Sequence, residues 1–188
     1  SVERASLSLP LDPLGPPVLT AFAAGRIVPG VIGGRGSLEM NNAGGALEIE
    51  GGSDVSLFPI KLRVAARVAV AQIPAADGGP ATGVAIALEV ELPVAIPLAQ
   101  SGFGIYGFLG MFAMHYARDE EGITSLTPAL TWLKDRAQGD PTNLQAWKPQ
   151  IDRWAFGAGL TLGTMGSPII FNVKGMFLLE LPGPRILL

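Results

Sequence analysis

The chain has 188 residues, with 13 Lys and Arg against 16 Asp and Glu, a net charge of -3 and no cysteine. The lack of cysteine excludes disulfides, thiolate nucleophiles and cysteine-based metal sites, and the lack of a basic tract argues against nucleic acid as a partner. Apolar residues reach 48%, charged residues only 15%, and 25 glycines with 16 prolines favour turns and strands over long helices. We therefore expect a single β-rich domain over residues 1–188.

The N-terminal ten residues lack the basic start and apolar run of a signal peptide, since they carry Glu3 and alternate leucine with serine. Patterned sequence reaches both ends of the chain, which leads to the hypothesis that it is a fragment of a longer polypeptide.

Further on, Ser37–Met40 and Ala46–Glu50 flank residues that tolerate positive φ. These two segments predict a hairpin with short strands.

Two longer segments predict a central hairpin. Even positions are apolar throughout Ile60–Val70, and Val84–Leu92 repeats this alternation after a turn-rich stretch. A period of two is typical of strands with one covered face. The large side chains of the second strand are expected to point inward: Val84, Ile86, Leu88, Val90 and Leu92.

Charge and hydrophobicity agree on one register for this hairpin. Lys61 would face Glu91, and Arg63 would face Glu89, so each cation would meet an acid across the strands. A slip of one residue would exchange the two faces, whereas a slip of two would keep the faces and lose one ion pair. The register that forms both pairs is therefore the predicted one.

Downstream, Phe103–Tyr116 carries bulky groups at both parities, which predicts a strand covered on both faces. Trp154–Leu162 and Ile169–Leu181 predict a third hairpin. Between them, residues 118–153 are more polar, and Thr127 followed by Pro128 is a typical helix start.

The predicted fold class is mainly β, an antiparallel meander of long amphipathic strands forming a barrel or sandwich, with a helical insert at about residues 118–153. Gly139 is expected to end the helix of that insert. Trp132, Trp147 and Trp154 are expected to anchor the insert on the sheet, because burying an aromatic ring contributes a few kcal/mol.

Candidate chemistry is sparse. Gly102–Gly107 matches the spacing of a dinucleotide-binding glycine motif, but that motif needs a strand that runs directly into a helix. His115, with Asp119 and Glu121, is the candidate site for metal binding or catalysis, and a structural role for the histidine is the competing interpretation. Carboxylate pairs two residues apart fit a hydrolytic cleft or, more simply, a solvated or cross-paired sheet face: Glu48 with Glu50, and Glu89 with Glu91.

Two uncharged segments have the length of membrane-spanning helices, Leu92–Met114 and, nearly, Trp154–Val173. Their many glycines and prolines disfavour helices, so a transmembrane β-barrel with bulky residues toward lipid fits the alternation better. The apolar character of both faces of Phe103–Met114 argues against a polar lumen.

A resemblance covers the C-terminal part of the chain. It is carried by Gly104–Phe112, by Trp154–Gly157, and by Lys174–Met176 with Leu179–Ile186. With these residues the segment 104–188 resembles a domain family of unknown function found in large β-rich bacterial proteins. The resemblance implies a β-rich segment of a long bacterial polypeptide and no catalytic residues.

The sequence-based hypothesis is a non-catalytic structural or assembly module that encloses a hydrophobic, lipid-like ligand. A transmembrane barrel or pore segment and an enzyme with a site near His115 are the alternatives. No cofactor or metal is expected, self-association or contact with neighbouring segments of a larger protein is expected, and the bacterial envelope or the extracellular space is favoured. The expected ligand-binding residues are Ile86, Leu88, Val90, Phe108 and Phe112.

Overall fold

The computed structural model describes residues 2–8, 18–28, 32–43, 46–75, 78–121, 123, 127–165 and 171–188. The side chains it describes are those of residues 32–40, 47–75, 78–121, 123, 127–136, 139–165 and 171–188.

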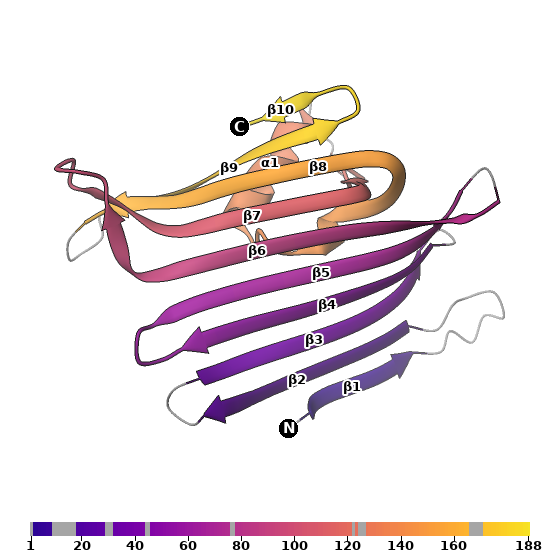
Figure 1. Ribbon diagram of the computed structural model, residues 1–188, viewed down its shortest axis with the longest axis horizontal. Coiled ribbons are helices and arrows are strands. Elements are labelled where there is room, and N and C mark those ends of the chain that lie inside the picture. Colours follow the sequence, from indigo (N-terminus) through magenta and orange to yellow (C-terminus); the bar gives the residue numbers. More distant parts are fainter. Residues whose placement is uncertain are drawn as a thin grey trace.

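Over these residues the strands form one antiparallel sheet in which neighbours in sequence are neighbours in space (Figure 1). The strands are β1 (Val2–Ser8), β2 (Val18–Val28), β3 (Ile32–Ala43), β4 (Ala46–Leu57), β5 (Leu62–Pro74), β6 (Pro80–Pro97), β7 (Phe103–Arg118), β8 (Trp147–Thr164), β9 (Asn172–Leu181) and β10 (Arg185–Leu187). The mainly β class and the antiparallel meander are confirmed. In the described part of the chain the sheet is open, with β1 and β10 at its two ends.

All three predicted hairpins are present. The pair β3 and β4 is longer than expected, with 12 residues in each strand. The pairs β5 with β6 and β8 with β9 follow the alternating segments, because period-two hydrophobicity suits only an extended backbone.

The predicted register of the central hairpin was wrong by two residues. Arg63 pairs with Glu91, and its Nη1 donates to the glutamate Oε1 at 3.0 Å. Lys61 lies in the preceding turn with φ of 53°, so it does not enter the strand. Glu89 instead accepts from Lys174 of β9, whose Nζ lies 2.5 Å from its Oε1. This slip keeps both faces of the hairpin and leaves one ion pair between its strands, Arg63 with Glu91, in place of the two expected pairs.

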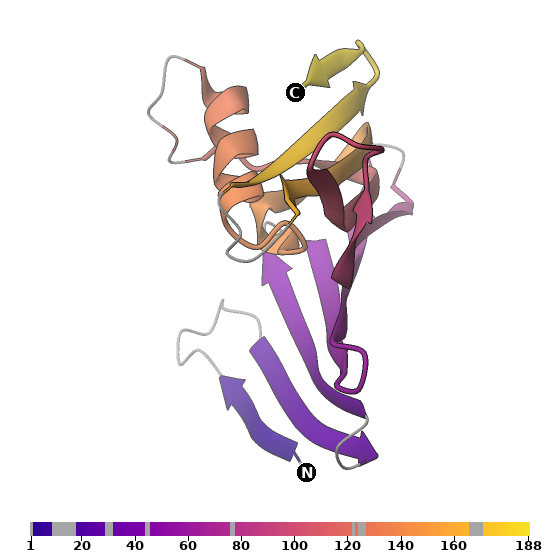
Figure 2. The same cartoon turned by 90° about the vertical axis from the view of Figure 1, so that its left-hand side faces the viewer.

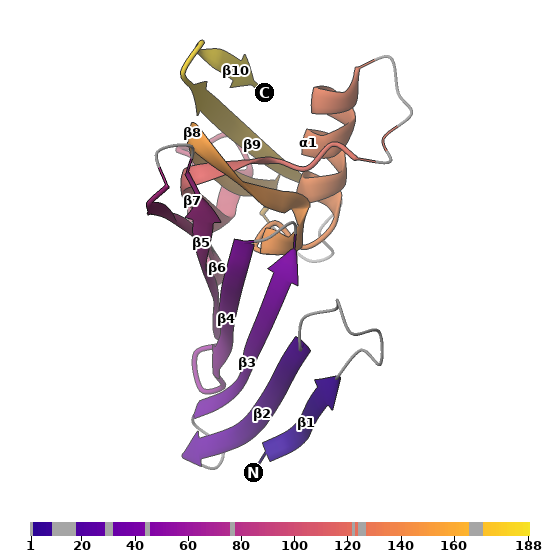
Figure 3. The same cartoon turned by 90° about the vertical axis from the view of Figure 1, so that its right-hand side faces the viewer.

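The insert between β7 and β8 contains helix α1 (Pro128–Gln138) and the short 3-10 helix η1 (Leu144–Ala146). The start after Thr127 and the end at Gly139 agree with the prediction. Residues 147–153 already belong to β8, so the helical part ends earlier than expected. Figures 2 and 3 show that α1 stands on one side of the sheet, near β8 and β9.

Two of the three tryptophans anchor the insert. Trp132 and Trp147 are each 3% exposed and meet edge to face with ring centroids 5.0 Å apart. Trp132 Nε1 donates to the carbonyl of Ala146 at 3.1 Å, which ties α1 to η1. Trp154 takes no part in this contact; it lies within β8 and is 37% exposed.

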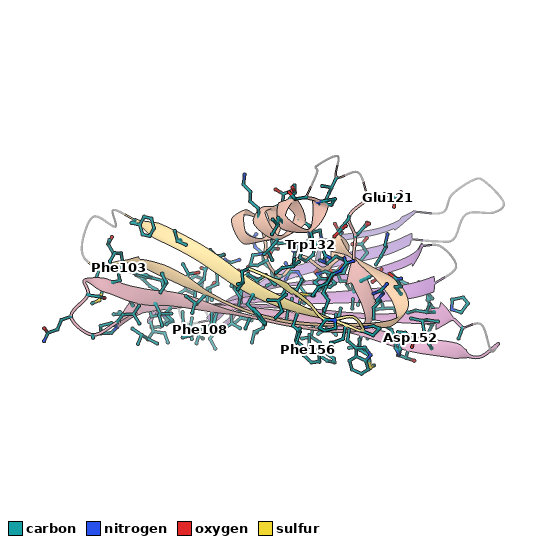
Figure 4. The ribbon with its side chains drawn as sticks, turned by 90° about the horizontal axis from the view of Figure 1, so that it is seen from above. Phe103, Phe108, Glu121, Trp132, Asp152 and Phe156 are labelled. Atoms are coloured by element: carbon teal, nitrogen blue, oxygen red, sulfur yellow. The ribbon has the colours of Figure 1, made fainter. Side chains whose placement is uncertain are left out.

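The assignment of inward and outward faces was also wrong. The large side chains of β6 are exposed, with Leu88 at 42%, while Ala85 and Ala87 between them are buried. Phe108 of β7 is 41% exposed, so β7 is covered on one face only. Figure 4 shows Phe108 and Phe156 on the side of the sheet opposite to Trp132 and α1. Small residues line the covered face because they leave room for the insert.

Candidate functional site

The candidate site is the uncovered face of the sheet, called here the apolar face. Register places its side chains in rows across the strands; one row runs from Val68 through Ile86, Phe112 and Phe156 to Leu179. Its large side chains stay more than one third exposed at these positions: Leu38, Leu47, Ile49, Val68, Val70, Ile86, Leu88, Phe108, Trp154, Phe156, Leu160, Val173 and Phe177.

The apolar face is convex. A Cβ built on Gly159, which points to the covered face, would lie 2.5 Å from the carbonyl oxygen of Gly175, whereas one built on Gly110 of the apolar face would meet nothing within 4 Å. Glu89 and Lys174 also meet on the covered side although two strands separate them, and in a flat sheet their strands would be roughly 14 Å apart. The sheet therefore curls toward the insert and away from the apolar face.

The rows of the apolar face carry no charge. At their paired positions, from Ile32 in β3 through Met114 in β7 and Trp154 in β8 to Leu181 in β9, the described residues include no Asp, Glu, Lys, Arg or His. Beyond the bulge at His115, Lys148 pairs with Ala117 at the end of the sheet. Polar groups stand near one end of the face, where the amide of Gln72 donates to the hydroxyl of Thr82 at 3.1 Å. In β8 and β9 the apolar positions span eight residue steps, which is roughly 27 Å of strand.

The five predicted ligand-binding residues come together on this face. Ile86 pairs with Phe112, and Val90 pairs with Phe108, on the adjacent strands β6 and β7, with Leu88 between them. They belong to an open surface, on which Ile86, Leu88 and Phe108 are 41–42% exposed. Beside Phe108 the surface has a shallow apolar hollow. Other residues lining that hollow are Leu160, Gly175, Phe177 and Leu188. Their role in ligand binding stays a prediction.

On the covered face, ionised side chains meet partners. Arg63 bridges neighbouring strands, with Nη2 2.7 Å from Asp54 and Nη1 3.0 Å from Glu91. The hydrogen bond from Arg63 lowers the pKa of the Asp54 carboxyl. The expected carboxylate pair Glu89 and Glu91 is thus divided between two cations, since Lys174 binds Glu89. These acids act as structural partners of cations in neighbouring strands.

The second carboxylate pair lies under the insert. Burial raises the pKa of Glu48, although the hydroxyl of Tyr116 donates to it at 2.8 Å. Burial also raises the pKa of Glu50, and the neighbouring charge of Glu39, its partner across β3 and β4, adds to this effect. Glu48 pairs with Ala71 and Glu50 with Ala69, and both alanines are buried, so the two acids lie on the covered face.

No protein-family model, curated protein or solved structure matched the chain. The resemblance of residues 104–188 to large bacterial proteins stays a prediction.

The other candidate motifs take part in contacts within the sheet and at its edge. His115 Nδ1 accepts the backbone N–H of Asp152 at 2.9 Å, and Asp119 is 3.5 Å from Lys148. Among the described residues, no cluster of three His, Asp or Glu has the arrangement of a metal site. Gly102–Gly107 leads into strand β7 and not into a helix, so the nucleotide motif lacks its structural context.

The two uncharged segments with the length of membrane-spanning helices begin and end in strands. Within the described residues, no helix has both the length and the apolar character needed to cross a membrane. Leu92–Met114 begins in β6 and ends in β7. Trp154–Val173 begins in β8 and ends in β9.

Sequence reasoning placed Trp154 at the start of a strand but wrongly expected its ring to anchor the insert. Its alternation with the apolar residues of that strand was the signal that the ring belongs to the apolar face. It stands at the end of the apolar face, with its ring 6.2 Å from that of Phe112.

Proposed function

We propose that this chain is a non-catalytic β module that forms part of the wall of a membrane-embedded sheet, with its apolar face against lipid acyl chains. The observation that carries the proposal is the convex, charge-free surface of large exposed side chains. Enclosure of a single lipid-like ligand fits the apolar face less well, because a convex surface does not surround a ligand.

The size of the surface supports a permanent apolar environment. The apolar face has thirteen large side chains that are each about two fifths exposed. Together they expose on the order of 1,000 Å² of apolar area. Monomeric soluble proteins rarely expose patches beyond roughly 300–600 Å². Transfer of this area out of water is worth about 25 kcal/mol, so a cover of some kind is strongly favoured.

Lipid fits this surface better than a protein partner does. Protein interfaces of this size carry about ten hydrogen bonds and a polar rim across their area, whereas the polar groups here stand mainly at the ends of the strands. Lipid-facing strands of membrane proteins carry an apolar band about 25 Å tall, bordered by aromatic residues. Because such strands are tilted, about 9–11 residues are needed to cross the hydrocarbon, and the apolar positions from Trp154 to Leu162 in β8 span nine residues.

The covered face supports the same proposal. Membrane sheets place small and polar side chains on the face away from lipid. Here that face carries buried alanines such as Ala85 and Ala113, together with the ion pairs of Arg63 and Lys174. The insert fills part of this side, so the charged groups are held away from the apolar face.

Because the chain has no cysteine, single cysteines can be introduced without background labelling. We would label each position of β6 from Val84 to Glu91 with a nitroxide and measure its accessibility to oxygen and to a water-soluble nickel complex in phosphatidylcholine vesicles. Even positions are expected to be accessible to oxygen and protected from nickel. Odd positions, which include Ala85 and Ala87, are expected to lack this pattern.

Two results would contradict the proposal. Nickel accessibility at Ile86 and Leu88 equal to that at the exposed helix residue Leu130 would place the face in water. Protection that appears equally without vesicles, and that depends on protein concentration, would assign the face to a second copy of the chain.

A further inference from the structure

A polar pocket of about 280 Å³ lies where the apolar face ends. Trp154 and Leu181, which form the last row of that face in β8 and β9, are part of its lining. The pocket extends to the turn between β9 and β10 and to the start of the insert. A molecule in this pocket would therefore lie beside both the charged side and the apolar face.

At the floor of the pocket one buried cation meets two acids. Arg118 is 8% exposed and donates to Glu180 from Nε at 2.5 Å and from Nη2 at 2.9 Å. Its Nη1 also donates to Glu120. Arg118 therefore offsets one of these two negative charges. The whole lining carries more cations than acids: Arg118, Lys148, Arg153 and Arg185 against Glu120, Glu121 and Glu180.

The rim carries cations with fewer partners. Arg153 and Arg185 are exposed, and within the described chain neither has an acidic oxygen within 4.0 Å. Lys148 also lines the pocket and lies 3.5 Å from Asp119, and Glu121 is the remaining acid of the lining. The rim therefore presents two guanidinium groups to whatever enters from solvent.

We infer that this pocket binds the phosphate of an anionic phospholipid headgroup, with Arg153 and Arg185 as its donors. A guanidinium matches the geometry of phosphate oxygens through two parallel hydrogen bonds. The lipid's acyl chains would then lie along the apolar face past Trp154, an aromatic residue of the kind enriched at membrane interfaces. This inference rests on the proposed function, because the headgroup site needs the neighbouring face to be in lipid.

The test measures association of the full chain, diluted from detergent, with phosphatidylcholine vesicles that contain or lack 30 mol% (about one third) phosphatidylglycerol. The variant R153Q/R185Q removes both proposed donors. The control K61Q/K134Q removes two exposed positive charges elsewhere and changes the net charge equally. The preference is the ratio of association with vesicles that contain phosphatidylglycerol to association with vesicles that lack it. We expect R153Q/R185Q to lower this ratio about thirtyfold and the control to lower it less than about threefold.

Each outcome separates the two proposals. Equal binding of the unaltered chain to both vesicles would overturn the headgroup site and leave the lipid-facing wall intact. No binding to either vesicle would overturn both. Equal losses in the two variants would indicate unspecific attraction and overturn the site. Calorimetric binding of inorganic phosphate that requires Arg153 and Arg185, without any vesicle preference, would assign the pocket to free phosphate and overturn the lipid as its ligand.

Discussion

Gly159→Ala tests the curvature on which the proposed function depends. The new Cβ would lie 2.5 Å from the carbonyl oxygen of Gly175 and 3.0 Å from Cδ1 of Leu109. Overpacking of this kind costs about 1–3 kcal/mol, and the contact with backbone leaves little room for adjustment. The matched control is Gly110→Ala on the opposite face, where a Cβ meets nothing within 4 Å. Replacing glycine within a strand there should stabilise the fold by about 0.5–1 kcal/mol.

The measurement is urea unfolding of both variants in the same detergent, followed by tryptophan fluorescence. We expect the free energies of unfolding to differ by roughly 2–3 kcal/mol, with Gly159→Ala below and Gly110→Ala above the unaltered chain. Equal effects of the two substitutions would mean that both faces are equally crowded. In that case the sheet would not curl toward the insert, and the argument for a convex lipid-facing surface would be refuted.

Two further substitutions test the two faces separately. Leu88→Lys places a charge in the middle of the apolar face and should weaken vesicle association at least about thirtyfold. The control Leu130→Lys, at a similarly exposed position of α1, should not weaken it. Similar losses in both variants would show that the apolar face is not the surface that contacts lipid. Glu50→Gln should raise the free energy of unfolding by roughly 0.5–1 kcal/mol at pH 7, because the folded chain raises the pKa of Glu50 through burial and then Glu39. An acid with a raised pKa is best tolerated when protonated, so this gain should vanish as the pH falls below the ordinary value of 4.5. A gain independent of pH in urea unfolding would show that charge is not its cause.

The three hairpins and strand β7 followed from the sequence, because period-two hydrophobicity has only one backbone solution, whereas β1, β2 and β10 were not predicted. The register did not follow fully, since Lys61 and Arg63 were equally good partners for an acid in the opposite strand. What decided between them was the left-handed turn at Lys61 and the arrival of Lys174 from β9 at Glu89. Contacts between strands so distant in sequence leave no trace in the local pattern.

The candidate site was predicted in part. Alternation placed Ile86, Leu88 and Val90 on one face, and the register with β7 brought Phe108 and Phe112 to the same face. The pattern contains no information on which face is covered, however. The assumption that large residues point inward is a rule for proteins in water. It fails here because the insert packs against the face that carries alanines and glycines.

The separation of charge from apolar area is the strongest physical reason to place lipid on this face. In a water-soluble sandwich, ion pairs such as that of Arg63 with Glu91 would be on the solvent side and the large residues would form the core. Here the ion pairs share a face with buried alanines and the insert, and Leu88 and Phe156 are on the outside. Surface ion pairs add little to stability, so their confinement to the concave side is hard to explain by folding alone. It is the arrangement expected where charge on the other face would have to enter hydrocarbon, which costs about 2–4 kcal/mol per residue near its middle.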